Sequence, residues 1–300
     1  MSKPQKITGP ALSPRKPADI SAAFAGLDEA LRLKLAACRD RLTSLGSVVV
    51  AFSGGVDSTF LLAVAVGTLG SKNAIAAIGL SPSLPQRELA EGRELAQKIG
   101  AKLVEIATNE LADPKYQANP KDRCFHCKSD LFVRLNNVAR EQGLACVASG
   151  ANADDVGDFR PGMAAAKKLG VVSPLLEAGL TKQDIRQASR ALGLPTADKP
   201  SMACLASRIP YGQPITAGKL SRIEHAEYVL KDLGFSQCRV RDHDTVARIE
   251  ITPPDFERLL ASREKIAKSL RALGYAYITV DLEGFRSGSM NEVLPGTPIS

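Results

Sequence analysis

The chain has 300 residues, of which 44% are hydrophobic and 5% aromatic, and it carries a formal net charge of +7. This length is enough for one large or two ordinary domains, with a core that needs no disulfide or metal staples. The positive charge suits an anionic ligand such as a nucleotide and permits RNA, but with no tryptophan the sequence indicates no base-stacking surface. No run of about 18 apolar residues occurs, so we expect no membrane span and a cytoplasmic protein.

Strands and helices alternate along the larger part of the chain, after a flexible tail that we expect over residues 1–24. Helices are predicted over 27–46, from the first strand to about residue 69, and over 86–99, 125–142 and 181–192. The predicted strands are 47–52, 74–80, 102–106, 146–150 and 171–175. This alternation is typical of a parallel, doubly wound α/β sheet, in which ligands bind at the carboxyl ends of the strands.

The pattern changes after Gly212. The predicted elements there are a helix over 216–233, strands over 238–241 and 246–251, a helix over 254–272 and a strand over 276–280. We therefore expect a nucleotide-binding α/β domain over 25–212. A smaller α+β domain over 213–300 would serve the substrate or oligomerisation.

A glycine-rich loop, Ser53-Gly54-Gly55-Val56-Asp57-Ser58, lies between the first strand and an apolar helix. Its glycines let backbone N–H groups approach an anion, the helix start adds its positive dipole end, and Asp57 can hold Mg²⁺ carried by phosphates. It is not a Walker A loop, because the Gly-Lys-Ser/Thr ending is missing, and it lacks the third glycine of a dinucleotide fingerprint. The alternative is a plain turn. After a strand, this loop instead resembles that of the ATP pyrophosphatases, and the resemblance implies that ATP phosphates bind at Ser53, Gly54, Gly55, Asp57 and Ser58.

Three cysteines form a candidate metal or redox group. Cys124 and Cys127 make a CxxC pair, which alone is compatible with zinc, iron–sulfur or redox chemistry, and Cys204 lies in the loop-like segment 200–212. No second CxxC occurs, so a four-cysteine zinc site is not expected. Three thiolates leave one metal position open, as a reactive cluster needs. The alternative is that the CxxC pair caps a helix and Cys204 is packed; core positions are expected for Cys38, Cys146 and Cys238.

Charged residues of the second half could form an anion site. Arginine pairs bidentately with phosphate or carboxylate, although a solvated surface explains any single one equally well. Acidic residues of the same region could bind a divalent cation or lie on a wet face. The arginines are Arg208, Arg239, Arg241 and Arg286, and the acids are Glu227, Glu250 and Asp255.

Together these segments resemble the LarE family, the ATP-dependent sulfur transferases of the ATP pyrophosphatase (PP-loop) superfamily. The resemblance covers about residue 30 to 292. The loop alone indicates only the superfamily, whereas the segments near Cys204 and near the chain's end are more specific. The segments that carry the resemblance are 53–58, 158–162, 204–212, 239–241, 247–250 and 281–288.

The resemblance implies a substrate, a pyridinium mononucleotide with two ring carboxylates that become thiocarboxylates for the nickel-pincer cofactor of lactate racemase. A carboxylate would attack the α-phosphorus of ATP, pyrophosphate would leave to the loop with Mg²⁺ near Asp57, and a sulfur nucleophile would displace AMP. Ser207, Arg208, Arg239 and Arg241 would hold the substrate. The family places an acidic metal site where Glu227, Glu250 and, more loosely, Asp255 fall.

The family has two sources of sulfur. In one version a cysteine at the Cys204 position gives up its own sulfur; in the other, three cysteines hold a [4Fe–4S] cluster that carries an extra sulfide. Because this chain has cysteine at all three positions, we favour the cluster on Cys124, Cys127 and Cys204, with Cys204 and Asp57 as the catalytic residues. We also expect a sulfide source and a homo-oligomer.

Three rivals remain open. A tRNA thiolation enzyme can combine the same loop with three cysteines, but the RNA-binding or zinc-ribbon extension expected of it is missing, so we expect no nucleic acid. An amide-forming ligase would not need three placed cysteines. A non-enzymatic nucleotide-binding or cluster-carrier protein would bind ATP and release no pyrophosphate.

Overall fold

A computed structural model describes residues 17–156, 161–200, 202–286 and 289–292. The chain divides into two compact units. The first consists mainly of residues 17–80, 86–108 and 124–200, and the second of residues 81–85, 109–123 and 202 onward. No helix among the described residues is both long and apolar enough to cross a membrane.

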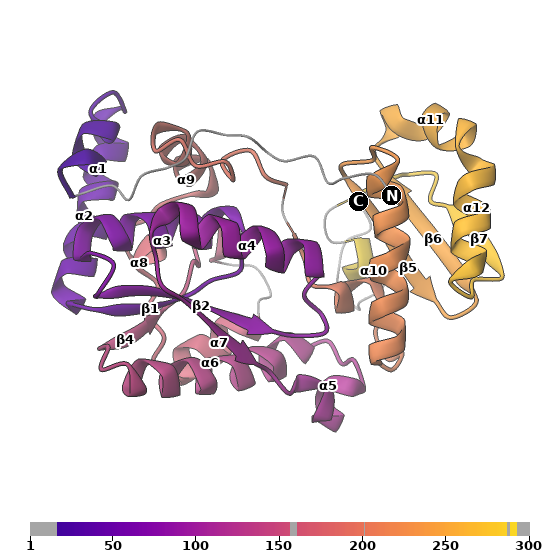
Figure 1. The fold of residues 1–300 in the computed structure, drawn as a ribbon, viewed down its shortest axis with the longest axis horizontal. Helices are drawn as coiled ribbons and strands as arrows, with labels where there is room; N and C mark the ends of the chain where they lie inside the picture. Colours follow the sequence, from indigo (N-terminus) through magenta and orange to yellow (C-terminus); the bar gives the residue numbers. More distant parts are fainter. Residues whose placement is uncertain (1–16, 157–160, 201, 287–288, 293–300) are drawn as a thin grey trace. The chain divides into compact units, whose positions relative to one another are not determined.

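The first unit contains a parallel four-stranded sheet with helices on both faces (Figure 1). Its strand order is β3-β2-β1-β4, with Val48 paired to Ala74 on one side and to Cys146 on the other. The doubly wound α/β expectation is therefore confirmed. The strands are β1 (Val48–Ala51), β2 (Ala74–Leu80), β3 (Leu103–Ala107) and β4 (Cys146–Ala148); the helices are α2 (Glu29–Leu45), α3 (Val56–Leu69), α4 (Gln86–Ile99), α6 (Arg123–Glu141), α7 (Pro161–Lys168), α8 (Pro174–Glu177) and α9 (Lys182–Ala191).

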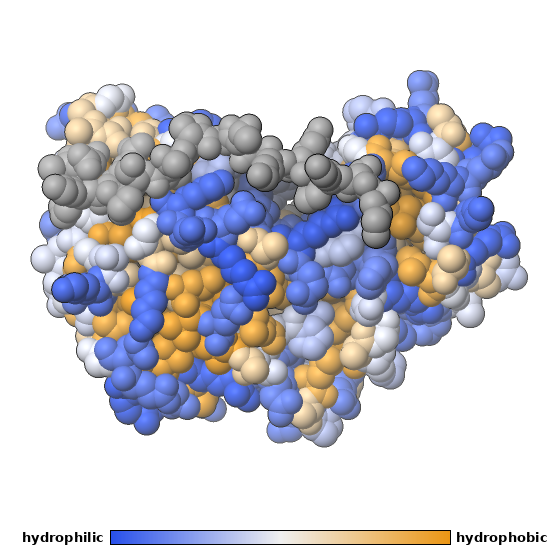
Figure 2. Space-filling model, in the orientation of Figure 1, coloured by the Kyte–Doolittle hydropathy of each residue, from blue (hydrophilic) through white to orange (hydrophobic). Residues whose placement is uncertain are grey.

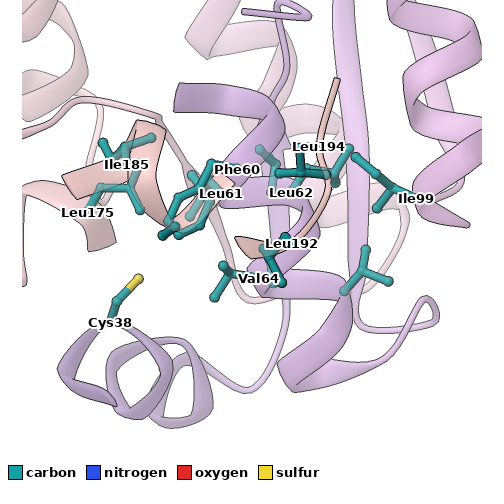
Figure 3. Close-up of a cluster of buried hydrophobic side chains, with 14 of the residues drawn as sticks. Cys38, Phe60, Leu61, Leu62, Val64, Ile99, Leu175, Ile185, Leu192 and Leu194 are labelled. Carbon is teal, nitrogen blue, oxygen red and sulfur yellow. The ribbon is translucent and has the colours of Figure 1, made fainter. Parts of the chain in front are cut away.

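Both faces of this sheet are buried, which explains why its strands are apolar throughout rather than alternating. Val48 and Val50 pack into the core that includes α2 and α3, whereas Val49 packs into a second core with α6 and α7. Figure 3 shows the first core, where Phe60, Leu61 and Leu62 of α3 lie among side chains from α9 and its neighbours. A helix covered on nearly every side forms a rigid base for the loop that precedes it.

Two expectations for this unit need correction. Residues 17–24 were assigned to the flexible tail, but they form α1 (Pro17–Phe24), whose Ile20 and Phe24 are buried against the core. Residues 171–175 were predicted as a strand, but only a single bridge joins Val172 to Ala148, and α8 begins at Pro174. Proline has no N–H for a ladder and is well suited to the first turn of a helix.

The second unit is a smaller α+β structure, as expected. Its sheet has the order β5-β6-β7, in which β5 and β6 form an antiparallel hairpin and β7 runs parallel to β6. The helix predicted over 254–272 is divided at Ser262, which ends one helix and caps the next. The elements are α5 (Pro114–Gln117), α10 (Ala217–Asp232), β5 (Cys238–His243), β6 (Val246–Ile251), α11 (Phe256–Ala261), α12 (Arg263–Ala272) and β7 (Tyr277–Val280), with short 3₁₀ turns η1 (Glu110–Ala112), η3 (Leu205–Arg208), η4 (Pro253–Asp255) and η5 (Ser289–Asn291); the first unit adds η2 (Ala153–Asp155).

The segment that carries Cys204 belongs to this second unit, so the boundary expected after residue 212 lies within it. Asn119, fully buried, donates from Nδ2 to the carbonyl oxygens of Ile209 (3.2 Å) and Pro210 (2.8 Å), and its own backbone carbonyl accepts from the N–H of Gly212 (3.0 Å).

Figure 2 shows hydrophobic residues gathered over the first unit on the drawn face, whereas hydrophilic residues cover most of the second.

Candidate active site

The glycine-rich loop joins the end of β1 to the start of α3. Gly54 has φ +68°, and a Cβ there would lie 3.5 Å from Cα of Gly92 in α4, so both conformation and space favour glycine. Gly55 caps α3 without a side chain, which leaves N–H groups of the first turn for an anion. The Ser58 hydroxyl holds the loop by accepting from the Ser53 N–H at 3.2 Å.

Gly150, which follows β4, brings another backbone against this loop. A Cβ at Gly150 would lie 3.0 Å from N of Ser58 and 3.1 Å from the carbonyl carbon of Asp57. The neighbours are backbone atoms that cannot turn aside, so only glycine fits. No sequence motif singled out this position, although a glycine just past the end of a parallel strand is a usable signal of close approach.

Asp57 lies in the first turn of α3 and has two different carboxylate oxygens. Oδ2 accepts a hydrogen bond from Nζ of Lys182, whereas Oδ1 is buried and has no hydrogen-bond partner among the described residues. An orphaned carboxylate oxygen beside an anion-binding helix start fits the ligand that a phosphate-bound Mg²⁺ needs. The residues present therefore fit the metal implied by the family.

Two lysines that sequence reasoning missed complete the loop's surroundings. Lys182 is the first residue of α9, and Lys199 donates to the carbonyl oxygen of Gly54 at 3.2 Å and to Glu88 and Glu91 at 2.9 Å each. One signal could have pointed to Lys182: the capping box of Thr181 predicts a helix start, where a cation opposes the helix dipole. A lysine at this unfavourable position indicates that an anionic group lies close to it.

None of the three candidate cluster cysteines forms a disulfide, and they lie in different units. Cys124 and Cys127 occupy the first turns of α6 in the first unit, and Cys204 is the exposed N-cap of η3 in the second. Within either unit, the described residues include no group of three His, Cys, Asp or Glu that could hold a metal ion. The [4Fe–4S] cluster therefore stays a prediction.

Cys38 and Cys238 are core residues, as expected, whereas Cys146 is half-buried and packs against the core of the first unit. Cys38 and Cys238 are fully buried, and burial raises the pKa of each thiol to about 12. Burial also raises the pKa of Cys146. A thiol that stays protonated is a poor nucleophile and a poor metal ligand.

Arg208, expected to bind substrate, is instead buried inside the second unit. Its Nε and Nη2 donate to the two oxygens of Glu227 at 2.8 and 3.0 Å. Its Nη1 donates to the carbonyl oxygens of Ala203 (2.7 Å) and Cys204 (3.0 Å). Burial disfavours both charges, but their mutual attraction dominates, so the pKa of Arg208 is raised and that of Glu227 is lowered.

Arg241 is held in the same manner. Its Nε and Nη2 donate to the oxygens of Glu250 at 2.9 and 2.6 Å, and its Nη1 donates to the carbonyl oxygen of Ser207 at 3.0 Å. Glu250 is wholly inaccessible and also accepts from Arg248. Arg241 thus ties β5 and β6 to the η3 turn.

Arg239 differs from these two arginines. Its guanidinium lies over the ring of Phe285, 5.0 Å from the centroid. Burial, together with the charges of Arg208 and Arg241, lowers the pKa of Arg239 to about 10. A bound anion would relieve this repulsion, so Arg239 is the best of the predicted arginines for a phosphate or carboxylate. Arg286 is paired with Glu283 and Glu292.

The structure does not bring the three predicted metal-binding acids together. Glu227 and Glu250 are each paired with an arginine, and Asp255 accepts from the Thr252 hydroxyl and from Arg258, both at 2.8 Å. The carboxylates of Glu227 and Glu250 are neutralised by guanidinium groups, so these residues do not fit a divalent site.

Comparison with known proteins identifies the family. A sequence model described as NAD synthase matches residues 36–155, which include the glycine-rich loop. Over 253 residues the chain is 36% identical to the pyridinium-3,5-bisthiocarboxylic acid mononucleotide synthase of Lactiplantibacillus plantarum, with 84% of this chain and 92% of that protein covered. The chain belongs to the LarE family of ATP-dependent sulfur transferases. The resemblance deduced from the motifs is confirmed.

Two further relatives carry no stated activity. An uncharacterized protein of Synechocystis sp. is 43% identical over 266 residues, covering 88% of this chain and 99% of that protein. An uncharacterized protein of Methanocaldococcus jannaschii is 27% identical over 240 residues, covering 80% and 91%. Of the segments that carry the LarE resemblance, residues 158–160 and 287–288 lie outside the described residues.

Proposed function

We propose that this enzyme uses ATP to convert the ring carboxylates of a pyridinium biscarboxylate mononucleotide into thiocarboxylates, a step toward the nickel-pincer cofactor of lactate racemase. The observation that carries the proposal is the likeness to the synthase of Lactiplantibacillus plantarum, which extends over both units and not the loop alone. The segments of the second unit that carry the LarE resemblance, near Cys204 and near the end of the chain, support a small-molecule substrate. The substrate is an anion, as the net charge of +7 favours.

The first half-reaction would take place at the glycine-rich loop. A substrate carboxylate oxygen attacks the α-phosphorus of ATP, the bond to the β-phosphate breaks, and pyrophosphate leaves with the electron pair. The N–H groups at the start of α3 and the hydroxyls of Ser53 and Ser58 would receive its charge. Mg²⁺, when bound at Asp57, would neutralise the phosphates, and Lys182 would contribute a further positive charge.

The second half-reaction replaces oxygen by sulfur. A sulfur nucleophile attacks the carbonyl carbon of the acyl-adenylate, and AMP departs with the former carboxylate oxygen. Arg239, with Ser207 of the same unit, would hold the substrate anion during both steps.

For the sulfur source we propose a [4Fe–4S] cluster on Cys124, Cys127 and Cys204. None of the three forms a disulfide, two of them are exposed, and thiolates are the ordinary ligands of such clusters. When bound, the cluster would carry an extra sulfide on the iron that lacks a protein ligand.

The test of the reaction is pyrophosphate release from ATP with and without the biscarboxylate mononucleotide, followed by mass spectrometry for oxygen-to-sulfur exchange. Release should require the substrate and should fall by about 10²–10³-fold in Asp57→Ala, because charge stabilisation of the departing group is lost. Glu105→Ala, which removes an acid paired with Arg93 on the surface of the same unit, is the control and should retain activity. Substrate-independent release would refute the proposal, and full activity of Asp57→Ala would refute the role of that residue.

The test of the sulfur source is the iron and acid-labile sulfide content of protein purified without oxygen. About four of each per chain is expected, with loss of both in Cys127→Ala and retention in Cys146→Ala, which removes a half-buried cysteine of the same unit. Iron-free protein that stays empty after reconstitution would instead assign the transferred sulfur to Cys204 itself.

A further inference from the structure

Both carboxylate oxygens of Glu227 are already engaged with a cation, the guanidinium of Arg208. It lies in α10 with 2% of its surface exposed. Oε1 accepts from Nε of Arg208 at 2.8 Å and from the backbone N–H of Val240 at 3.2 Å, and Oε2 accepts from Nη2 of Arg208 at 3.0 Å. This arrangement is a bidentate carboxylate–guanidinium pair, whose geometry fixes the plane of the arginine.

The third nitrogen of the Arg208 guanidinium, Nη1, binds the peptide around Cys204. Nη1 donates to the carbonyl oxygens of Ala203 and Cys204 and to the Ser207 hydroxyl, at 2.7, 3.0 and 2.9 Å. The η3 turn itself is only four residues long and supplies few backbone hydrogen bonds of its own. A planar group anchored on one side by Glu227 therefore sets the conformation of the Cys204 segment on the other.

We propose that Glu227 is a positioning residue, which acts through Arg208 to fix the peptide that carries Cys204, and that it is not a ligand of a divalent metal. The inference rests on the proposed function, since Cys204 matters only if it takes part in sulfur transfer. It reassigns Arg208 as well: the guanidinium positions the reactive segment and does not bind substrate.

Electrostatics favour this assignment over a metal site. A divalent cation on Glu227 would be repelled by the Arg208 guanidinium that contacts both oxygens, and displacing Arg208 would leave a buried guanidinium without a counter-charge, which is strongly unfavourable. Arg239 and Arg241 add positive charge close by. The charge of Arg239 helps to lower the pKa of Glu227, and the charge of Arg241 helps to lower the pKa of Arg239. Glu250, the second predicted metal-binding acid, is likewise paired with Arg241.

The experiment compares Glu227→Gln with the unaltered chain by two readouts. The first is the number of thiocarboxylates formed per pyrophosphate released, which should fall by about tenfold, because sulfur transfer needs the Cys204 segment in place and adenylation does not. A merely structural loss would lower both products together and leave this ratio unchanged. Glu227→Asp keeps the charge and should recover part of the ratio, whereas Arg208→Lys loses the fork and should behave as Glu227→Gln does.

The second readout is amide hydrogen exchange of the peptide that covers residues 203–209, which needs neither substrate nor catalysis. The N–H groups of Leu205 and Ser207 donate to Ser83 and Cys204, and their exchange should become about tenfold faster in Glu227→Gln. If no thiocarboxylate forms with any variant, the proposed function fails while this readout still tests the positioning.

Asp242→Asn is the matched control. Asp242 is equally buried in the same unit, and its Oδ2 accepts from both Nε and Nη2 of Arg222 and from the Tyr275 hydroxyl, while Oδ1 accepts from the Asp244 N–H; these partners lie outside the Cys204 segment. This variant should keep both the ratio and the exchange of 203–209, even where its stability drops. Two results would overturn the proposal: unchanged exchange and ratio in Glu227→Gln, or a Mn²⁺ site, detected by electron paramagnetic resonance without ATP, that Glu227→Gln abolishes.

Discussion

The two units differ in how they provide positive charge for an anionic ligand. The first uses six consecutive residues, 53–58, whose backbone N–H groups and helix dipole need no charged side chain to create a positive site. The second uses arginines from separate elements, and two of them, Arg208 and Arg241, are neutralised by buried glutamates before any ligand arrives. A contiguous backbone site is therefore open to its ligand, whereas the charges of Arg208 and Arg241 maintain the structure of the second unit.

The largest expected effect is on the stability of the second unit. Glu250→Ala would leave the buried guanidinium of Arg241 without its partner, and removal of one member of a buried pair typically costs about 3–5 kcal/mol. Urea unfolding followed by a probe in the second unit should show this loss. The double variant Glu250→Leu with Arg241→Met should recover much of it, because no unpaired charge remains.

Glu283→Ala is the control for that experiment. Glu283 is 69% exposed and pairs with Arg286, so its loss should change the free energy of unfolding by less than about 1 kcal/mol. Equal effects of the two substitutions would mean that burial does not distinguish these pairs, and the contrast between the two units would fail.

The next effect is on the loop of the first unit. Gly150→Ala would place a Cβ about 3.0 Å from the backbone nitrogen of Ser58, so the start of α3 must move. We expect destabilisation of about 1–3 kcal/mol and at least about a tenfold loss of pyrophosphate release, since small displacements of positioning groups are costly. Gly26→Ala, where the added Cβ meets nothing within 4 Å, should have neither effect. Normal release by Gly150→Ala would show that the loop tolerates displacement.

What could be predicted from the sequence differs in the same way between local backbone patterns and the pairing of charged side chains. The loop, the parallel sheet and the helix after it are local patterns, in which apolar strands and glycines at fixed offsets determine the structure. The end of the tail was misjudged because Ile20 is buried by tertiary contact with the core and not by a local pattern. The strand predicted at 171–175 failed at Pro174, whose ring favours the helix start that the structure shows.

The partners of charged side chains could not be read from the sequence. Arg208 meets Glu227 across 19 positions, and Lys182 meets Asp57 across 125. Which carboxylate an arginine reaches depends on the packing of α10 against η3 and β5, and burial then makes the choice strong. The sequence therefore indicated only that these arginines could converge, whereas the pairing of Arg208 with Glu227 and of Arg241 with Glu250 needed the structure.

The smallest expected effect concerns Asp184 at the start of α9. Burial raises the pKa of this carboxyl, but hydrogen bonds from Lys34 and Thr181 outweigh it, so the pKa is lowered from its usual 3.8. A lowered folded-state pKa stabilises the protein above pH 3.8, and the contribution is lost as the pH falls through the folded-state value. Asp184→Asn keeps a side-chain oxygen for the cap but loses the charge pair, so we expect a cost of about 0.5–1 kcal/mol near pH 7. Urea midpoints of both chains should converge as the pH is lowered below that value. A gap that persists in acid would mean that shape and not charge stabilises this helix start, in contrast to the buried pairs of the second unit.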